Sequence, residues 1–169
     1  MITVEYEKFN LVCCYTPNAG DKLKRLEYRT QVYIRIRIRV WDPEFRRYVS
    51  KLKSTRPTLI AGDLNVAYTV KDIYNPFGKE KYACFTPEER SSFGRLLSDG
   101  WFDTYRYLNP NGNKFSYFSY RTNAIEDNKG WRIDYFLACE EMIARVGSSD
   151  INNVMRASDH MPIELMINV

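Results

Sequence analysis

The amino-acid sequence predicts a single α/β domain. Apolar runs typical of strands alternate with helical patterns along the 169 residues, and no repeat or low-complexity linker divides the chain. The apolar fraction of 44% and the aromatic fraction of 15% indicate a packed core. We therefore expect one folded domain over residues 1–169.

The first predicted elements are two strands that form a hairpin. Residues 2–6 alternate apolar and polar side chains, and residues 9–15 are almost continuously apolar, with Glu7 and Lys8 between them. The sequence Pro-Asn-Ala-Gly at 17–20 then predicts a loop, because Asn and Gly tolerate left-handed backbone angles.

A helix is predicted after Asp42, with Asp42 as its N-cap and Pro43 in its first turn. Residues 57–61 form a short apolar run that predicts a strand, which delivers the chain to Gly-Asp-Leu-Asn at 62–65. Polar residues at the end of a strand are a common site of function in α/β folds.

A second helix is predicted from a capping box at Thr86 and Glu89, and it is expected to end near Gly100. Apolar patterns near residues 117–120, 133–138 and 162–167 predict the remaining strands.

Residues 32–40 fit none of these elements. They alternate β-branched residues with arginine, and they interrupt what would otherwise be one helix over 25–29 and 41–52. One interpretation is a basic strand for a nucleic-acid backbone, and the other is an inserted, solvent-facing hairpin. We favour the insertion.

Charge and cysteine content narrow the class of protein. A formal charge of +4 is compatible with a polyanionic partner. The cysteines Cys13, Cys14, Cys84 and Cys139 have no CxxC spacing, and His160 is the only histidine, so we expect buried, reduced thiols in a reducing compartment and no zinc site. No apolar run approaches the roughly 20 residues of a membrane span, so we expect a soluble, intracellular protein with no membrane partner.

Two short motifs carry the candidate chemistry. Asp63 and Asn65 leave one strand and should share a face, which suits the orientation of a water molecule and the binding of a phosphate oxygen. Asp159 precedes His160, whose imidazole could act as a general acid or base or donate to a phosphate oxygen. Each pair taken alone is more typical of an ordinary turn.

The order of three motifs is more specific. Gly-Asp-Leu-Asn at 62–65, Gly-Trp-Arg-Ile-Asp-Tyr at 130–135 and Ser-Asp-His-Met-Pro-Ile at 158–163 resemble the C-terminal half of the abasic-site endonucleases of the exonuclease III type, within the endonuclease/exonuclease/phosphatase superfamily. The resemblance extends over nearly the whole chain except 32–40. It implies part of a four-layer α/β/β/α sandwich, which as an isolated half would expose strand edges and one sheet face.

The resemblance implies DNA base-excision repair by Mg²⁺-dependent hydrolysis of the phosphodiester 5′ to an abasic site, with Mn²⁺ as an alternative ion and 3′-exonuclease or phosphodiesterase activity as an extension. By the same resemblance, Asp63 orients or deprotonates the attacking water and Asn65 contacts the scissile phosphate. His160 stabilises the transition state, Asp134 orients that imidazole, and Asp159 lies near the metal.

The resemblance also assigns DNA contacts. Tyr15 and Asn18 match phosphate-contacting positions, while Trp131 and Tyr117 match the wall of the pocket that receives the flipped-out sugar of duplex DNA. Tyr117 stands where the family usually has Phe, which could narrow that pocket. Lys79, Lys81 and Arg121 lie in loops that resemble DNA-flanking loops, although a solvated surface explains them equally well, and Lys79 and Tyr82 stand where some relatives have Asn.

The family's first metal-ligand motifs, which resemble S-W-N-V-N-G and L-Q-E-T-K, do not occur in this sequence. We therefore expect weak metal binding and impaired activity, unless an N-terminal half complements the chain. Two alternatives stay open: a catalytically inactive abasic-DNA-binding or interaction module, and a changed substrate such as RNA or a 3′-blocked end. A repair role predicts the nucleus, or alternatively the mitochondrion.

Overall fold

The computed structural model describes residues 1–30, 40–120, 123–155 and 157–168. Its main sheet has five strands in the order β1-β2-β3-β5-β4. These strands are β1 (Ile2–Glu5), β2 (Asn10–Tyr15), β3 (Thr58–Asp63), β4 (Trp101–Asp103) and β5 (Asp134–Cys139). β2 and β3 are parallel, and the other neighbouring pairs are antiparallel. The α/β class is thereby confirmed.

A two-stranded sheet and several helices complete the fold. The small sheet pairs β6 (Val146–Ile151) with β7 (Ile163–Ile167). The α-helices are α1 (Leu26–Thr30), α2 (Trp41–Lys53), α3 (Pro87–Ser98), α4 (Thr104–Leu108) and α5 (Glu140–Ile143), and the 3₁₀ helices are η1 (Asp21–Leu23) and η2 (Val70–Asp72). No helix within the described ranges has the length and apolar character to cross a membrane.

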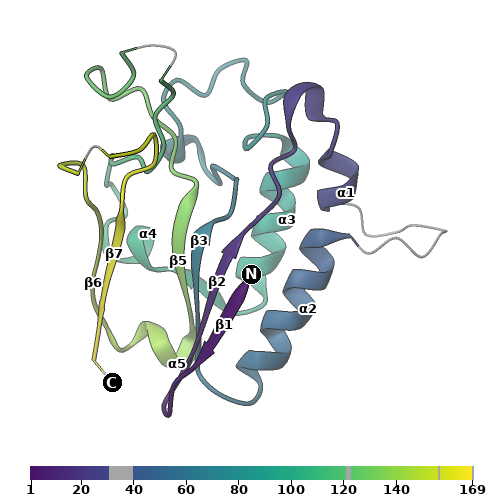
Figure 1. Cartoon of the computed structure of the whole chain (residues 1–169), viewed down its shortest axis with the longest axis vertical. Coiled ribbons are helices and arrows are strands. Elements are labelled where there is room, and N and C mark those ends of the chain that lie inside the picture. The colour runs from purple at the N-terminus through teal and green to yellow at the C-terminus, as the bar shows by residue number, and fades with distance from the viewer. Residues whose placement is uncertain (31–39, 121–122, 156, 169) are drawn as a thin grey trace.

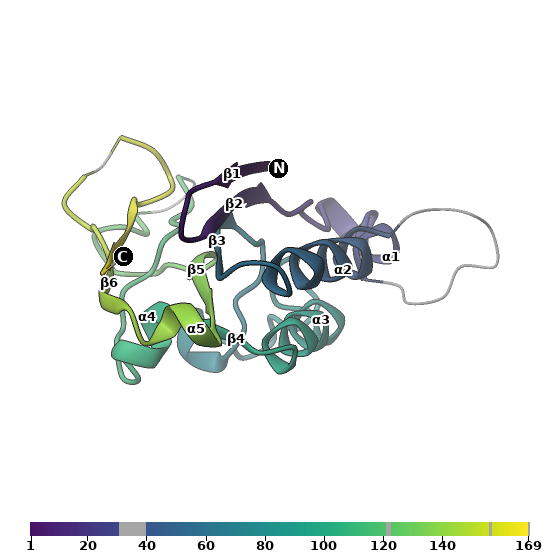
Figure 2. The ribbon, with the colours of Figure 1, turned by 90° about the horizontal axis from the view of Figure 1, so that it is seen from below.

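The main sheet has helices against one face and a second, smaller sheet near the other (Figure 1). Figure 2 shows α2 and α3 on one side of the sheet and the β6–β7 hairpin on the other. Val12, Ile60 and Leu137 are fully buried in the principal core with Val49 of α2 and Leu96 of α3. This layer of helix on sheet, with further strands on the opposite face, agrees with part of the expected sandwich.

The face of the sheet away from α2 and α3 is incompletely covered. Ile2 at the edge is 69% exposed, and Cys13 opposite it in the β1–β2 register is also exposed. A shallow apolar groove runs here between Ile2, Phe136 and Ile163. The prediction of an exposed sheet face and edge is therefore confirmed, and the prediction that every thiol is buried is wrong at Cys13.

The local predictions had mixed outcomes. The opening hairpin and the strands at 57–61, 133–138 and 162–167 are confirmed, with boundaries shifted by up to two residues. The capping box is also confirmed: Thr86 Oγ1 accepts from Glu89 N at 3.2 Å, and Thr86 N donates to Glu89 Oε2 at 3.1 Å.

Two local predictions were wrong. α2 has Val40 as its N-cap, so Asp42 lies inside the first turn, where it pairs with Arg29 instead of capping the helix. Residues 117–120 form no strand; Tyr117 makes only isolated bridges to Trp131 and His160. The segment 32–40 lies outside the described residues except for Val40, as does Arg121.

Candidate active site

The site lies at one edge of the main sheet, where β2 and β3 end and β5 begins. The register places Tyr15 of β2 beside Asp63 of β3, and Asp63 beside Asp134 of β5. Residues at the same level of adjacent strands have neighbouring side chains. The topology therefore brings together residues that are 48 and 71 positions apart in the chain.

A glycine makes the close strand approach at this edge possible. Gly62 has φ +133°, and a Cβ atom there would lie 2.0 Å from the backbone oxygen of Cys14. A side chain at position 62 would separate β2 from β3 directly beside Asp63. This explains why Gly precedes Asp in the Gly-Asp-Leu-Asn motif.

Asp63 and Asn65 meet through a turn. β3 ends at Asp63, and Asn65 adopts the left-handed region with φ 48°. The Asn65 backbone N donates to Asp63 Oδ1 at 2.8 Å, and Asn65 Nδ2 donates to Asp63 Oδ2 at 3.0 Å. The two side chains are adjacent as predicted, although the reason is this turn and not alternation along a strand.

Asn65 lies beneath the surface of the site. It is 2% exposed, and its Nδ2 also donates to the backbone oxygen of Thr16 at 2.8 Å. Its Oδ1 accepts from Asn18 Nδ2 at 2.7 Å and from the Cys84 thiol at 3.3 Å. Asn65 therefore orients Asp63 and Asn18, and a direct contact between Asn65 and a phosphate would require these bonds to rearrange.

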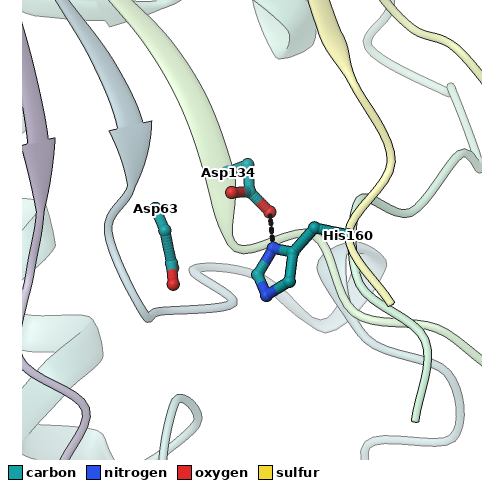
Figure 3. A group of neighbouring side chains, drawn as sticks. All are labelled: Asp63, Asp134 and His160. Carbon is teal, nitrogen blue, oxygen red and sulfur yellow. Dashed lines mark hydrogen bonds and ion pairs between the residues drawn. The ribbon is translucent and has the colours of Figure 1, made fainter. Parts of the chain in front are cut away.

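Asp134 and His160 form a close pair (Figure 3). His160 Nδ1 lies 2.8 Å from Asp134 Oδ2. This hydrogen bond, followed by the negative charges of Asp134 and Asp63, raises the pKa of His160 above its ordinary 6.5. With Nδ1 held by Asp134, Nε2 is the imidazole nitrogen left for another partner.

Asp63 lies on the other side of this pair. Burial and, after it, the negative charge of the nearby Asp134 carboxylate raise the pKa of Asp63 from 3.8 to about 6. Ligand atoms of Asp63, Asp134 and His160 lie within 4.8 Å of one another, so these residues could hold a metal ion. Asp159 does not belong to this group within the described part of the chain, and its assignment to the metal stays a prediction.

Ser116 is a positioning residue that the sequence analysis missed. Its fully buried Oγ accepts from the backbone N of Ile133 and of Asp134, both at 3.0 Å. These bonds fix the first residue of β5, and with it the Asp134 carboxyl. A lone Ser in an aromatic stretch gives no signal of this role.

Buried ion pairs anchor the backbone segments that carry the site residues. Arg29 donates to the backbone oxygens of Leu64 at 2.7 Å and Asn65 at 2.6 Å, and to Glu89 Oε1 at 3.0 Å. Near the other end of the site, Arg132 binds Asp72 Oδ1 at 2.8 Å and Asp103 Oδ2 at 2.6 Å. Arg29 and Arg132 are at most 2% exposed. The turn after Asp63 and the segment before Asp134 are thus both anchored to buried charges.

A cleft of about 710 Å³ opens in front of these groups. Asp63 and His160 line it, together with Tyr15 and Asn18. Tyr117 and Trp131 form part of its wall: their backbones pair, with Tyr117 N donating to Trp131 O at 2.8 Å. The Tyr117 ring lies 5.1 Å from the His160 ring. The residues predicted for catalysis and for the aromatic pocket therefore line one cleft, except Asp134, which contacts it through His160. Asp159 lies outside the close acidic group.

The comparisons with known proteins agree with this geometry. The sequence profile of the Endonuclease/Exonuclease/phosphatase family matches residues 12–160. The chain is 40% identical over 170 residues to the DNA repair nuclease APEX1 of Danio rerio, and 35% identical over 170 residues to an exodeoxyribonuclease of Bacillus subtilis. Both alignments cover 100% of this chain, but 52% and 64% of the relatives.

The fold is also similar to that of solved structures. An AP endonuclease from Leishmania major superposes with a TM-score of 0.86 at 31% identity, over 95% of this chain and 50% of that one. The chain thus spans about half to two thirds of the length of these relatives. With the family profile covering residues 12–160, the chain belongs to the Endonuclease/Exonuclease/phosphatase family.

Proposed function

We propose that this chain carries the water-activating and phosphate-stabilising groups of a nuclease that hydrolyses the phosphodiester 5′ to an abasic site in duplex DNA. The observation that carries this proposal is the position of Asp63 beside the Asp134–His160 pair in an aromatic-walled cleft. The names of the relatives, a DNA repair nuclease and AP endonucleases, support a base-excision repair role. They speak against an inactive binding module.

The two sides of the site suit complementary proton chemistry. With a pKa of about 6, Asp63 is mostly ionised at neutral pH yet is more basic than an ordinary carboxylate, so it can take a proton from an attacking water. Asp134 favours the protonated form of His160, whose Nε2–H can donate to a phosphate oxygen as negative charge develops there. Trp131 and Tyr117 would enclose the base-free sugar.

The donor set of the described residues is too small for Mg²⁺ by itself. Both Asp63 oxygens accept hydrogen bonds from Asn65, one Asp134 oxygen accepts from His160, and the third candidate offers nitrogen. Mg²⁺ prefers octahedral ligation by oxygen. We propose that Mg²⁺, or alternatively Mn²⁺, takes further ligands from Asp159 and from an N-terminal half that complements this chain.

The test is incision of a duplex oligonucleotide that contains a single abasic-site analogue. The chain would be assayed with Mg²⁺, alone and joined to the N-terminal half of the Danio rerio relative. We expect incision by the joined protein, reduced roughly 10²- to 10⁴-fold by Asp63→Asn and by His160→Gln, because each variant removes a proton-transfer group. Asp150→Asn on β6 is the matched control and should leave the rate unchanged.

The outcomes separate the candidate functions. No incision by the joined protein, together with metal-independent preference for abasic over intact duplex, would favour the inactive binding module. Incision that Asp63→Asn and His160→Gln leave unchanged would disprove the assigned roles. Incision of an RNA strand or a 3′-blocked end in preference to the abasic duplex would point to the changed substrate.

A further inference from the structure

Residues 74–82, here called the rim, end at Lys81 and Tyr82 in the wall of the cleft and expose three aromatic rings within nine residues. Tyr74 is 42% exposed, Phe77 is 86% exposed and Tyr82 is 60% exposed. Lys79 and Lys81 lie between these rings in the sequence. Single exposed aromatic residues are ordinary, but a cluster of them interleaved with cations beside a cleft is a candidate binding surface.

Hydrogen bonds give this rim a defined shape. Tyr74 N donates to Gly130 O at 2.9 Å, which ties the start of the rim to the residue before Trp131. Turns are closed from Tyr82 N to Lys79 O at 2.9 Å and from Phe85 N to Tyr82 O at 3.1 Å. The exposed rings are therefore held on an ordered backbone, so little conformational entropy would be lost when they bind a planar ligand.

The rim is continuous with the proposed active site. Lys79 Nζ lies 5.5 Å from the Trp131 ring centroid and 5.9 Å from the Tyr74 ring centroid, and it also donates to Tyr74 O at 2.8 Å. Lys81 and Tyr82 line the same cleft as Trp131 and His160. A strand whose phosphate lies near His160 would thus pass Lys81 and Tyr82, and from there it could continue along the exposed remainder of the rim.

We propose that the rim of residues 74–82 binds unpaired nucleobases of a nucleic-acid strand, which stack on Tyr82 and Phe77 while Lys79 and Lys81 face the adjacent phosphates. Every base offers a π-face, and bases inside a duplex already use theirs on one another, so exposed rings select unpaired bases. This deepens the proposed function, because it assigns to the same cleft a substrate with unpaired bases next to the scissile phosphate.

The test is fluorescence anisotropy of labelled oligonucleotides in EDTA, so that no metal or activity is needed. The probes are a mixed-sequence single strand of DNA, the same strand in duplex, its RNA counterpart, and a strand of equal length and charge built from base-free sugars. We expect the base-bearing single strands to bind about fivefold or more tightly than the base-free strand, because stacking adds to the shared phosphate attraction.

Variants locate the effect. Tyr82→Leu and, independently, Phe77→Ala should each weaken single-strand binding roughly fivefold or more, whereas Tyr82→Phe keeps the ring and should bind like the unchanged protein. Tyr107→Leu is the matched control, since Tyr107 is 58% exposed but lies on α4 and not on the rim. All three positions are at the surface, so circular dichroism should show an unchanged fold in each of the four variants.

Equal binding of the base-free and base-bearing strands would overturn the inference, as would full affinity in both Tyr82→Leu and Phe77→Ala. Preference for the DNA or the RNA single strand would identify the source of the bases. Failure of abasic-site incision would leave this binding result standing, and loss of the binding result would leave incision standing, so the two proposals fail separately.

Discussion

Behind the Asp63–Asn65 turn, charged groups are buried and paired at close range, whereas in front of it the charged groups face an open cleft with few partners. At the back, Arg29 and Glu89 are at most 2% exposed and meet at 3.0 Å. At the front, His160 retains 34% of its side-chain exposure and has one carboxylate partner at 2.8 Å. The buried ion pairs, here called the back of the site, fix its geometry. The groups that face the cleft, here called the front, are available for chemistry.

The number of cationic partners also determines whether the pKa of a carboxyl group is raised or lowered in these two regions. The front Asp63 is partly buried beside a like charge, which raises its pKa. The buried Asp72 has two arginine partners, and these outweigh its burial and lower its pKa. The Asp72 carboxylate is therefore surrounded by cations at the back of the site, whereas Asp63 lies beside a like charge where a proton or a ligand can be exchanged.

The largest expected effect on stability comes from removing the buried ion pair of Arg29 at the back of the site. Arg29→Met removes the ion pair with Glu89 and the donors to the Leu64 and Asn65 oxygens, which leaves a buried carboxylate unpaired. We expect the free energy of unfolding to fall by about 3–5 kcal/mol, measured by urea denaturation. Arg47→Met is the control: its ion pair with Glu44 is exposed, so its loss should cost less than about 1 kcal/mol. Equal losses of unfolding free energy in the two variants would show that the buried pair contributes no more to stability than the exposed pair.

The sequence could predict the helix that contains Arg29 but not the use of this arginine. Its partners lie 35, 36 and 60 residues further along the chain, and only the parallel pairing of β2 with β3 and the packing of α1 on α3 bring them close. Local patterns recover elements whose signal is local, such as the capping box at Thr86 and Glu89. The family resemblance supplied the long-range grouping of Asp63, Asp134 and His160.

The two incorrect local predictions, the N-cap at Asp42 and the strand at 117–120, have the same origin. Asp-Pro-Glu at 42–44 has the pattern of a helix start, but tertiary pairing with Arg29 placed Asp42 inside the turn. Tyr-Phe-Ser-Tyr at 117–120 has strand propensity, but its backbone is used for single bridges to Trp131 and His160 that shape the cleft wall. In both places long-range contacts override a local pattern.

A smaller effect on stability is expected at Ser116, whose buried hydroxyl holds the backbone of Asp134 at the front of the site. Ser116→Ala leaves the buried N–H group of Ile133 and the partly buried N–H group of Asp134 without their acceptor. We expect a loss of about 1–3 kcal/mol and faster hydrogen exchange at those two amides. Ser54→Ala is the control, because the exposed Ser54 hydroxyl only donates to Lys51 O. Unchanged exchange at Asp134 would rule out Ser116 as a positioning residue.

The smallest effect is expected at the front, in the titration of His160. Because His160 is the only histidine, its Cε1 proton gives one NMR resonance of this type, and the chemical shift of that resonance against pH reports the His160 pKa. Its folded pKa is raised above 6.5, so its contribution to stability is fully present below about pH 6.5 and is lost as the pH rises through the folded pKa. Asp134→Asn removes the hydrogen-bonded charge and should lower this pKa.

Glu44→Gln removes one negative charge from α2 and is the matched control for this titration. If both variants shift the His160 pKa equally, long-range charge and not the 2.8 Å contact sets its value. If only Asp134→Asn shifts it, the pair acts locally, as the open front requires. The protonation of His160 then depends chiefly on the Asp134 carboxylate, which the buried Ser116 hydroxyl holds in place at the start of β5.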